Sequence, residues 1–327
     1  MPTPCAQSAF VISLDFELMW GVRDHLTKEQ YGRNVLGARE AIPRLLDCFA
    51  GRNLRATWAT VGLLFCESKD EMLATRPSQP LRYARAALNN YDYLGEVGPD
   101  ERRDPYYFGA SLIDRITAAP GQEIGTHTFS HFYCLEPGAT DADFAADLAA
   151  AVKVAERQGV RLRSIVFPRN QYDDAKIELC RRFGLKVYRG NEIHWLYRSS
   201  AAHRQTRLRR GLRLLDAYLD VGGSHTTNRP TTPGAMLNVA SSRFLRPYSR
   251  RLAALEPIRL DRIRTAMSRA AAIGGIFHLW WHPHNFGADL EPNMRCLGAI
   301  LDHFTVLQER TGMVSCAMGD FAADVEV

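Results

Sequence analysis

Apolar residues along this chain gather in short runs, and segments with helical spacing lie between the runs. The run at 10–17 predicts a buried strand, and apolar positions three and four residues apart over 140–158 predict an amphipathic helix. Further strands are expected at 55–62, 123–126, 164–168, 185–188, 275–281 and 313–318, and further helices at 38–52, 111–119, 173–183 and 293–311. This alternation indicates an α/β fold with a parallel sheet, either an open sheet or a barrel.

Two stretches interrupt the alternation. Residues 67–105 are polar, with scattered Pro and Gly and a helical section near 81–88, and they predict an insertion after the second strand. Residues 198–269 are rich in arginine and predict an excursion of helices and a loop, 222–233, before a late strand. The glycine-rich loops that bind dinucleotides and nucleotide phosphates are missing from the sequence. We therefore favour a distorted (β/α) barrel of about seven to eight strands, as one domain over 1–327.

The composition is that of an ordinary globular protein. Of 327 residues, 46% are hydrophobic and 24% charged, which excludes disordered, collagen-like and coiled-coil chains. The first residues lack the pattern of a secretory signal, and the most apolar stretch, 273–281, is shorter than the roughly 20 residues that cross a bilayer. Seven scattered cysteines without a Cys-x-x-Cys pair fit reduced thiols. We therefore expect a cytoplasmic protein without a transmembrane segment.

The strongest local signal for chemistry is the segment Gly-Thr-His-Thr-Phe-Ser-His, which ends at His131 and directly follows a short predicted strand. His127 and His131 are four residues apart, so on one helical turn both imidazoles would face the same side. That arrangement suits a divalent metal ion. The alternative is a pair of exposed or packed histidines.

Two carboxylates stand at the end of the first strand. Asp15 and Glu17 are two residues apart, so in a strand both project to one face while Phe16 points to the other. Carboxylates on an otherwise apolar strand are costly to bury unless they are paired or bound to a cation. Caps or salt bridges at a strand end are the alternative, but beside two histidines the metal site is favoured.

A late strand carries a third group of polar residues. His278, Trp280 and His282 share one face of the strand, and Pro283 ends it directly after His282. A histidine at a strand end is a candidate general acid. Packing and a second metal site are the alternatives for this group.

Together these motifs resemble the polysaccharide deacetylase (NodB-homology, carbohydrate esterase) family, whose members are metal-dependent hydrolases on a distorted (β/α) barrel. The resemblance extends from about residue 10 to 321, and the His-Thr-x-Ser-His core is its most specific part. It implies that His127 and His131 bind a metal ion, that Asp15 is the catalytic base, and that His282 protonates the leaving amine. One divalent ion is expected, with zinc favoured and cobalt, nickel or manganese as alternatives.

The sequence departs from the family pattern at two places. The family's first motif has two adjacent aspartates, but here Phe16 occupies the second position, so Glu17 is the natural replacement as metal ligand, and the roles of Asp15 and Glu17 could be reversed. The family's Arg-x-Pro-Tyr motif is also altered, because Pro168 precedes Arg169. We expect Arg169 to orient the base, with a surface salt bridge as the alternative.

The resemblance also implies a substrate class. It predicts hydrolysis of an N-acyl group, expected to be acetyl, from an amino sugar, and the cytoplasmic location favours an intermediate of surface-polysaccharide biosynthesis such as O-antigen. Two alternatives stay open: an amidase or deformylase for a non-sugar or cyclic amide, and a barrel that binds carbohydrate or an anion without turnover. The expected substrate-binding residues are Trp20, Trp280, His284 and Asn170, with Gln171 as the alternative to Asn170.

The formal charge of +5 conceals an uneven distribution. Residues 198–269 contain 15 arginines and four acids, a net +11, whereas the remainder carries −6. No aromatic interleaving or binding motif accompanies the arginines, so no specific nucleic acid is expected. A phosphate or pyrophosphate that carries the sugar would suit arginine forks, and a solvated helix face or an oligomer interface is the alternative. The candidate arginines are Arg204, Arg207, Arg209, Arg210 and Arg213. The oligomeric state is not predicted.

Overall fold

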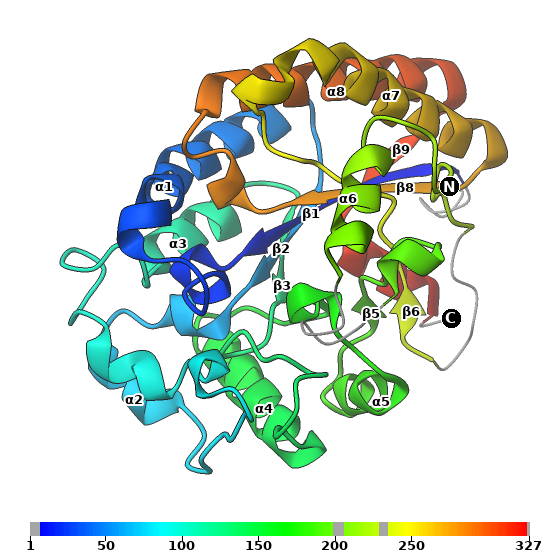
Figure 1. Cartoon of the computed structure of the whole chain (residues 1–327). Coiled ribbons are helices and arrows are strands. Elements are labelled where there is room, and N and C mark those ends of the chain that lie inside the picture. Colours follow the sequence, from blue (N-terminus) through cyan, green and yellow to red (C-terminus); the bar gives the residue numbers. More distant parts are fainter. Residues whose placement is uncertain (1–6, 199–205, 229–234, 326–327) are drawn as a thin grey trace.

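The computed structural model describes residues 7–198, 206–228 and 235–325. Its strands are β1 (Ala9–Phe16), β2 (Ala56–Thr60), β3 (Gln122–Thr126), β4 (Ser164–Ile165), β5 (Val187–Tyr188), β6 (Leu237–Asn238), β7 (Arg243–Phe244), β8 (Ile276–Trp281) and β9 (Val314–Cys316). They form one sheet in the order β6-β5-β4-β3-β2-β1-β8-β7, and β9 pairs with β1 (Figure 1). Every pairing between these strands is parallel, as the alternation of strands and helices predicted.

The two ends of this strand order belong to one short stretch of chain. β6 pairs with β5 and β7 pairs with β8, yet only four residues separate them. Within that link, the Ser241 amide donates to the Gly190 carbonyl, and the Ser242 amide donates to the His278 carbonyl. The stretch therefore joins both edges and curls the sheet. If it is counted as one strand, the expected distorted barrel of seven to eight strands is confirmed.

Helices surround the sheet in Figure 1. They are α1 (Lys28–Ala50), α2 (Lys69–Thr75), α3 (Ala110–Ala118), α4 (Asp141–Arg157), α5 (Asp174–Arg182), α6 (Arg207–Asp216), α7 (Glu256–Ile273) and α8 (Leu290–Thr311). Local chemistry sets several of their ends: Thr140 and Asp143 form a capping box at the start of α4, and left-handed Gly274 and Gly312 end α7 and α8. Within the described ranges, no helix combines the length and the apolar character that a membrane crossing needs.

Three expectations about the elements change. α1 begins at Lys28, ten residues earlier than the apolar spacing indicated, because Thr27 and Gln30 form a capping box there. The predicted helical section at 81–88 is wrong, since only Ala86–Leu88 makes a single helical turn. Leu81 packs into the core from a segment without regular secondary structure. The helix of this insertion is α2. The loop expected at 222–233 lies partly outside the described residues, and the single-domain assignment stays a prediction.

Candidate active site

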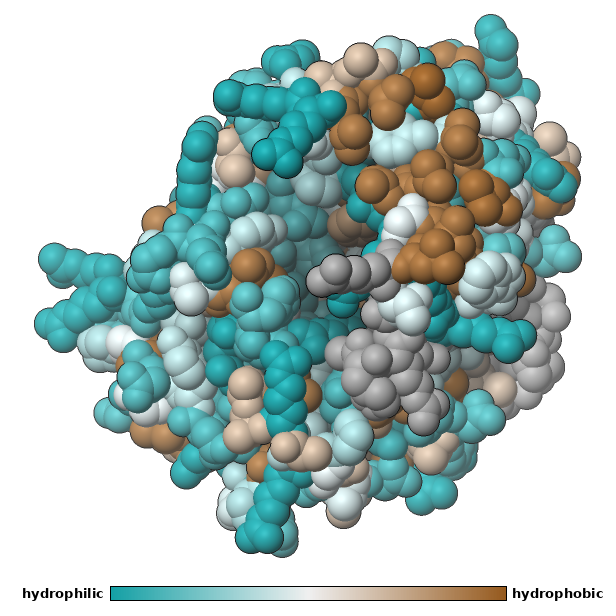
Figure 2. Space-filling view, in the orientation of Figure 1, coloured by the Kyte–Doolittle hydropathy of each residue, from teal (hydrophilic) through white to brown (hydrophobic). Residues whose placement is uncertain are grey.

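The carboxyl ends of β1, β3, β5 and β8 meet at one end of the sheet, where a cleft of about 670 Å³ opens. In a parallel barrel this is the end at which side chains from different strands converge. Figure 2 shows a hydrophilic hollow in the middle of this face. Eight acidic and histidine side chains line the cleft: Asp15, Glu17, Asp24, His25, His127, His131, His282 and His284. The structure thus brings together the three sequence motifs.

Glu17 and the two histidines form a compact cluster. Glu17 Oε2 lies 2.9 Å from His131 Nε2 and 3.3 Å from His127 Nε2, and all three side chains are buried. Burial raises the pKa of Glu17, but the charges of His282 and His131 outweigh it and hold the pKa well below its usual value. In the described part of the chain this is the one group whose donor atoms lie close enough together to hold a metal ion, within 4.8 Å of one another.

The position of His127 favours a metal ligand. Its Nδ1 lies 2.7 Å from the Val166 carbonyl, which can accept a hydrogen bond only from a protonated Nδ1. The lone pair is then on Nε2, which faces Glu17. A hydrogen bond from the second nitrogen to a carbonyl is the usual support of a metal-bound imidazole. Two imidazoles and one carboxylate are donors that suit zinc.

The loop that carries the histidines is not the helical turn that their spacing suggested. Thr128 and His131 both have left-handed backbone angles, with φ of 63° and 61°. Asp147 of α4 holds the loop, because its carboxylate accepts hydrogen bonds from the amides of Phe129 and Ser130. The rings still meet, with centroids 5.0 Å apart. The expected helical turn is therefore wrong, although the expected shared side is correct.

Asp15 is held by an arginine that the sequence analysis did not select. The Arg189 guanidinium, fully buried at the end of β5, donates to both Asp15 oxygens over 2.7 and 2.8 Å. It also donates to Ser13 Oγ and Asn170 Oδ1, and it lies 4.1 Å from the centroid of the Trp280 ring. Burial raises the pKa of Asp15, but the Arg189 charge outweighs it and the pKa is lowered.

The expectation that Arg169 orients the base is therefore wrong. Arg169 donates to both oxygens of Asp24, each over 2.7 Å, and lies over the Tyr133 ring. Its backbone is left-handed, with φ of 54°, in the turn after β4. The signal that could have identified Arg189 was its place directly after a predicted strand, where a barrel keeps its functional residues.

His282 lies opposite the carboxylates of Asp15 and Glu17, and Asn285 fixes the orientation of its ring. Asn285 Nδ2 donates to Tyr31 Oη, so Oδ1 is left to accept from His282 Nδ1, 3.2 Å away. His282 Nε2 then faces the two carboxylates, 3.7 Å from Asp15 Oδ2 and 3.5 Å from Glu17 Oε1. The sequence analysis missed Tyr31 and Asn285, although Asn285 follows His282 by three residues.

The remaining histidines of this strand lie deeper. The His284 ring stacks against His282 at 5.0 Å, and burial together with the charge of His282 lowers its pKa to about 3. His284 is therefore neutral, and it lines the cleft although its side chain is almost fully buried. His278 is buried between the Val239 carbonyl and Ser13 Oγ, which confirms the packing alternative for this residue.

Of the expected substrate-binding residues, Asn170, Trp280 and His284 line the cleft, as does Gln171. The Trp280 Nε1 donates to Glu192 over 3.3 Å. Trp20 does not line the cleft: it is fully buried and donates to the Tyr107 carbonyl, because the turn after β1 folds back into the core. The expectation that Trp20 binds substrate is wrong.

No protein-family model and no curated protein matches the chain. Solved structures do match over almost all of it. A Mycobacterium smegmatis protein assigned as a polysaccharide deacetylase is 15% identical, with a TM-score of 0.62 over 99% of this chain and 92% of its own. A Pseudomonas aeruginosa PAO1 protein with the same assignment is 12% identical, with a TM-score of 0.55 over 99% and 93%. A GH57-type branching enzyme of Pyrococcus horikoshii is 14% identical, with a TM-score of 0.53 over 98% and 71%.

These likenesses concern the fold. The chain has the NodB-like polysaccharide deacetylase fold, as its sequence motifs implied.

Proposed function

We propose that this protein is a metal-dependent hydrolase that removes an N-acetyl group from an amino sugar. The observation that carries the proposal is the Glu17–His127–His131 cluster beside an Asp15 carboxylate held by Arg189. The fold supports the same class, because two of the solved structures that share it are assigned as polysaccharide deacetylases.

The donor set supports one divalent ion, with zinc favoured. Glu17, His127 and His131 would hold it, because their donor atoms converge and His127 has its second nitrogen bonded to a carbonyl. A bound ion supplies Lewis-acid activation of water and of the acyl oxygen. Asp15 lies outside the group of metal-binding donors, and both of its oxygens accept hydrogen bonds from Arg189. We therefore assign Asp15 to proton transfer.

The other groups in the cleft support roles in proton transfer. The lowered pKa keeps Asp15 ionised at neutral pH, so it can accept a proton from an attacking water. His282 faces the same space with Nε2, from which it can donate a proton to the departing nitrogen. Arg189 positions Asp15 by hydrogen bonds to both of its oxygens, and Asn285 positions His282 by a hydrogen bond from Nδ1, which leaves Nε2 to face the cleft.

We further propose that the substrate is an intermediate of surface-polysaccharide assembly, processed in the cytoplasm and carried on a phosphate or pyrophosphate. The Trp280 ring at the cleft wall suits the face of a sugar. The six described cysteines are free thiols, which fits a reducing compartment. Residues 198–269, with their excess of arginine, border the cleft through Arg210 and Phe244.

The test combines elemental analysis with an acetate-release assay on purified protein. We expect about one divalent ion per chain and acetate release from N-acetylhexosamine derivatives, both lost in His127→Ala. The matched control is His303→Ala, because His303 contacts Ser268 on the outer helices and does not line the cleft. Formate release, or turnover of non-sugar amides alone, would favour the amidase alternative. Metal-loaded protein without turnover of any amide would favour a binding protein.

A further inference from the structure

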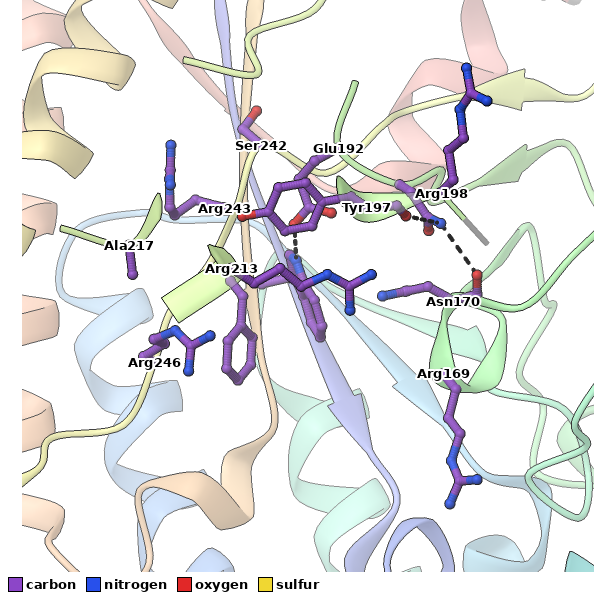
Figure 3. Close-up of a pocket in the computed structure, with 13 residues that line it drawn as sticks. Arg169, Asn170, Glu192, Tyr197, Arg198, Arg213, Ala217, Ser242, Arg243 and Arg246 are labelled. Atoms are coloured by element: carbon purple, nitrogen blue, oxygen red, sulfur yellow. Dashed lines mark hydrogen bonds between the residues drawn. The ribbon is translucent and has the colours of Figure 1, made fainter. Parts of the chain in front are cut away.

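A second cavity, of about 190 Å³, adjoins the cleft (Figure 3). The two spaces share the side chains of Arg169, Asn170, Phe244 and Trp280. The Trp280 ring lies 5.8 Å from the His282 ring, so the cavity opens close to the proposed proton donor. One molecule can therefore occupy the cleft and the cavity together.

Five arginines line the cavity: Arg169, Arg198, Arg213, Arg243 and Arg246. Arg169 is paired with Asp24, and Arg243 is paired with the buried carboxylate of Asp216. The Arg198 side chain points away from the cavity in Figure 3. Arg213 and Arg246 contribute two further guanidinium groups to the lining.

Arg246 is a partly buried cation that the described residues do not neutralise. Its guanidinium lies 6.0 Å from the centroid of the Phe244 ring, and no carboxylate in the described part of the chain forms an ion pair with it. Burial lowers its pKa, and the nearby charge of Arg259 lowers it as well. Loss of hydration without an acidic partner is unfavourable for a charged group unless a ligand supplies the opposite charge.

Arg213 approaches from α6. Its side chain extends across the cavity toward Asn170 in Figure 3, and its Nε donates to the Leu196 carbonyl over 2.9 Å. Burial lowers its pKa, followed by the charge of Arg209. The carboxylate that lines the cavity is Glu192, and it accepts a hydrogen bond from Trp280. The lining of the cavity thus contains five arginines and one carboxylate, a composition that suits an anion.

We infer that this cavity binds a phosphate group carried by the substrate whose N-acyl group lies in the cleft. The inference rests on the proposed function for the identity of the substrate, but the anion site is tested independently below. Planar guanidinium groups match phosphate oxygens, and the volume suits a phosphate rather than a second large ring.

Most of the five arginines that the sequence indicated as phosphate-binding residues do not belong to this cavity. Arg209 donates to the carbonyls of Trp195, Leu196 and Arg198, so it supports the backbone. Arg210 lines the cleft and not the cavity. Arg204 and the side chain of Arg207 lie outside the described residues. Only Arg213 is retained, and Arg246 is added.

The experiment measures methyl phosphate binding to metal-free protein by calorimetry, so that a bound ion cannot hold the anion. Arg246→Met and Arg213→Met should weaken binding about 10- to 100-fold, the loss expected for one charge-assisted contact. The control, Arg250→Met, removes an exposed arginine outside the cavity and should bind as the wild type does. Arg213→Lys, which keeps a charge, provides a second variant should Arg213→Met fail to fold. Equal affinity in all variants, or tighter binding of glucuronate than of methyl phosphate, would overturn the inference.

Two further probes identify the carrier. Tighter binding of uridine diphosphate supports the site and assigns a nucleotide carrier, whereas tighter binding of decyl phosphate supports it and assigns a lipid carrier. Because these measurements need no turnover, a failure of the proposed deacetylation leaves the binding result intact. Phosphate binding that fails beside normal acetate release would refute this inference alone.

A different observation, the apolar surface of α6, carries a second inference. Leu208, Leu215 and Leu219 expose 73%, 49% and 57% of their surface, and they follow one another by seven and four residues, which places them on one side of the helix and its extension. Buried Ala217 lies on the opposite side, and buried Asp216 lies on the flank between the two. An ordinary surface helix turns its apolar side toward the core, whereas α6 exposes these three leucines to solvent.

This apolar surface continues beyond the helix. Tyr218, which follows α6, and exposed Ile258 of α7 line one cavity, together with charged residues that include Asp220 and Asp261. Figure 2 shows apolar side chains gathered beside the hydrophilic hollow, over α6 and α7. Exposed Arg210 and Arg250 lie in the same arginine-rich stretch. An apolar stripe accompanied by arginines is typical of helices that lie in the surface of an anionic membrane.

We infer that the apolar face of α6 docks on an anionic lipid bilayer. A second copy of the chain is disfavoured, because α6 carries four arginines and one aspartate and two such helices would repel each other. Docking there would place the cleft at the membrane surface.

Sedimentation with phosphatidylcholine vesicles, with and without phosphatidylglycerol, tests this. We expect binding to the phosphatidylglycerol vesicles, and a loss of at least tenfold in the double variant Leu215→Glu, Leu219→Glu. The matched control is Leu36→Glu with Leu73→Glu, two exposed leucines on α1 and α2. Absence of binding to phosphatidylglycerol vesicles would refute the inference. A dimer in solution that the α6 variant dissociates would instead assign the face to a second copy.

Discussion

Replacing Arg189 by Met should remove the main support of the proposed base. Arg189 is buried and donates to both oxygens of Asp15, and it also donates to Ser13 and Asn170. Methionine fills much of the same space without a charge. Asp15 would then stay buried without its main cationic partner.

The variant should lose both folding stability and catalytic activity. Removing one partner of a buried ion pair costs about 3–5 kcal/mol of folding stability, because the other charge is left without compensation. Burial raises the pKa of Asp15 and the Arg189 charge lowers it, so the pKa should rise in the variant. Less carboxylate is then present at a given pH, and the acidic limb of kcat/KM moves to higher pH. A misplaced base should lower kcat/KM by about 100- to 10,000-fold.

The assay is acetate release as a function of pH, with urea denaturation on the same preparations. Arg189→Lys keeps a charge but loses the fork, and we expect an intermediate effect. Arg169→Met is the matched control, since it removes an arginine of the cleft wall that pairs with Asp24 and not with Asp15, and it should leave the acidic limb in place. An unchanged acidic limb and unchanged stability in Arg189→Met would refute the assignment of Arg189.

Three further predictions concern the metal cluster, the arginine-rich stretch and the packing of α1. Glu17→Gln should lose its bound divalent ion in elemental analysis while staying folded, and a stoichiometric ion in the folded variant would contradict Glu17 as a ligand. Asp216→Asn should lose about 3–5 kcal/mol at pH 7, because it leaves Arg243 without its carboxylate partner and Arg262 with the exposed Asp220 alone. Burial raises the pKa of Asp216, but hydrogen bonding to His225 and the Arg243 charge lower it overall, so its contribution is present above the unfolded pKa of about 3.9 and disappears at lower pH. The difference from the wild type should therefore be large in urea denaturation at pH 7 and small under acid conditions; equal stability at pH 7 would refute this. In Gly37→Ala the new Cβ would lie 2.3 Å from the Gly287 carbonyl oxygen, so the melting temperature should fall, and an unchanged value would show that α1 can shift freely.

Much of the site could be predicted because it consists of short local signals at strand ends. The alternation of strands and helices indicated a parallel barrel, and a parallel barrel gathers the ends of its strands on one face. Asp15, His127 and His282 each follow or end a strand, so their meeting in one cleft required only the strand positions. The expected helical turn at His127 failed because four-residue spacing also fits a loop with two left-handed residues.

The sequence by itself determined the fold class and the polar residues at the strand ends, since these follow from periodicity and from the ends of apolar runs. It left open whether Asp15 or Glu17 joins the two histidines, and in the structure Glu17 lies with them. The tertiary structure decided which arginine holds Asp15. Arg189 and Asp15 are 174 residues apart, and only the curvature of the sheet brings the end of β5 toward β1. It likewise decided that Trp20 is buried and that Arg213 and Arg246 meet in one cavity. Long side chains reach across several ångströms in many directions, so their partners depend on distances that local patterns of hydrophobicity do not contain.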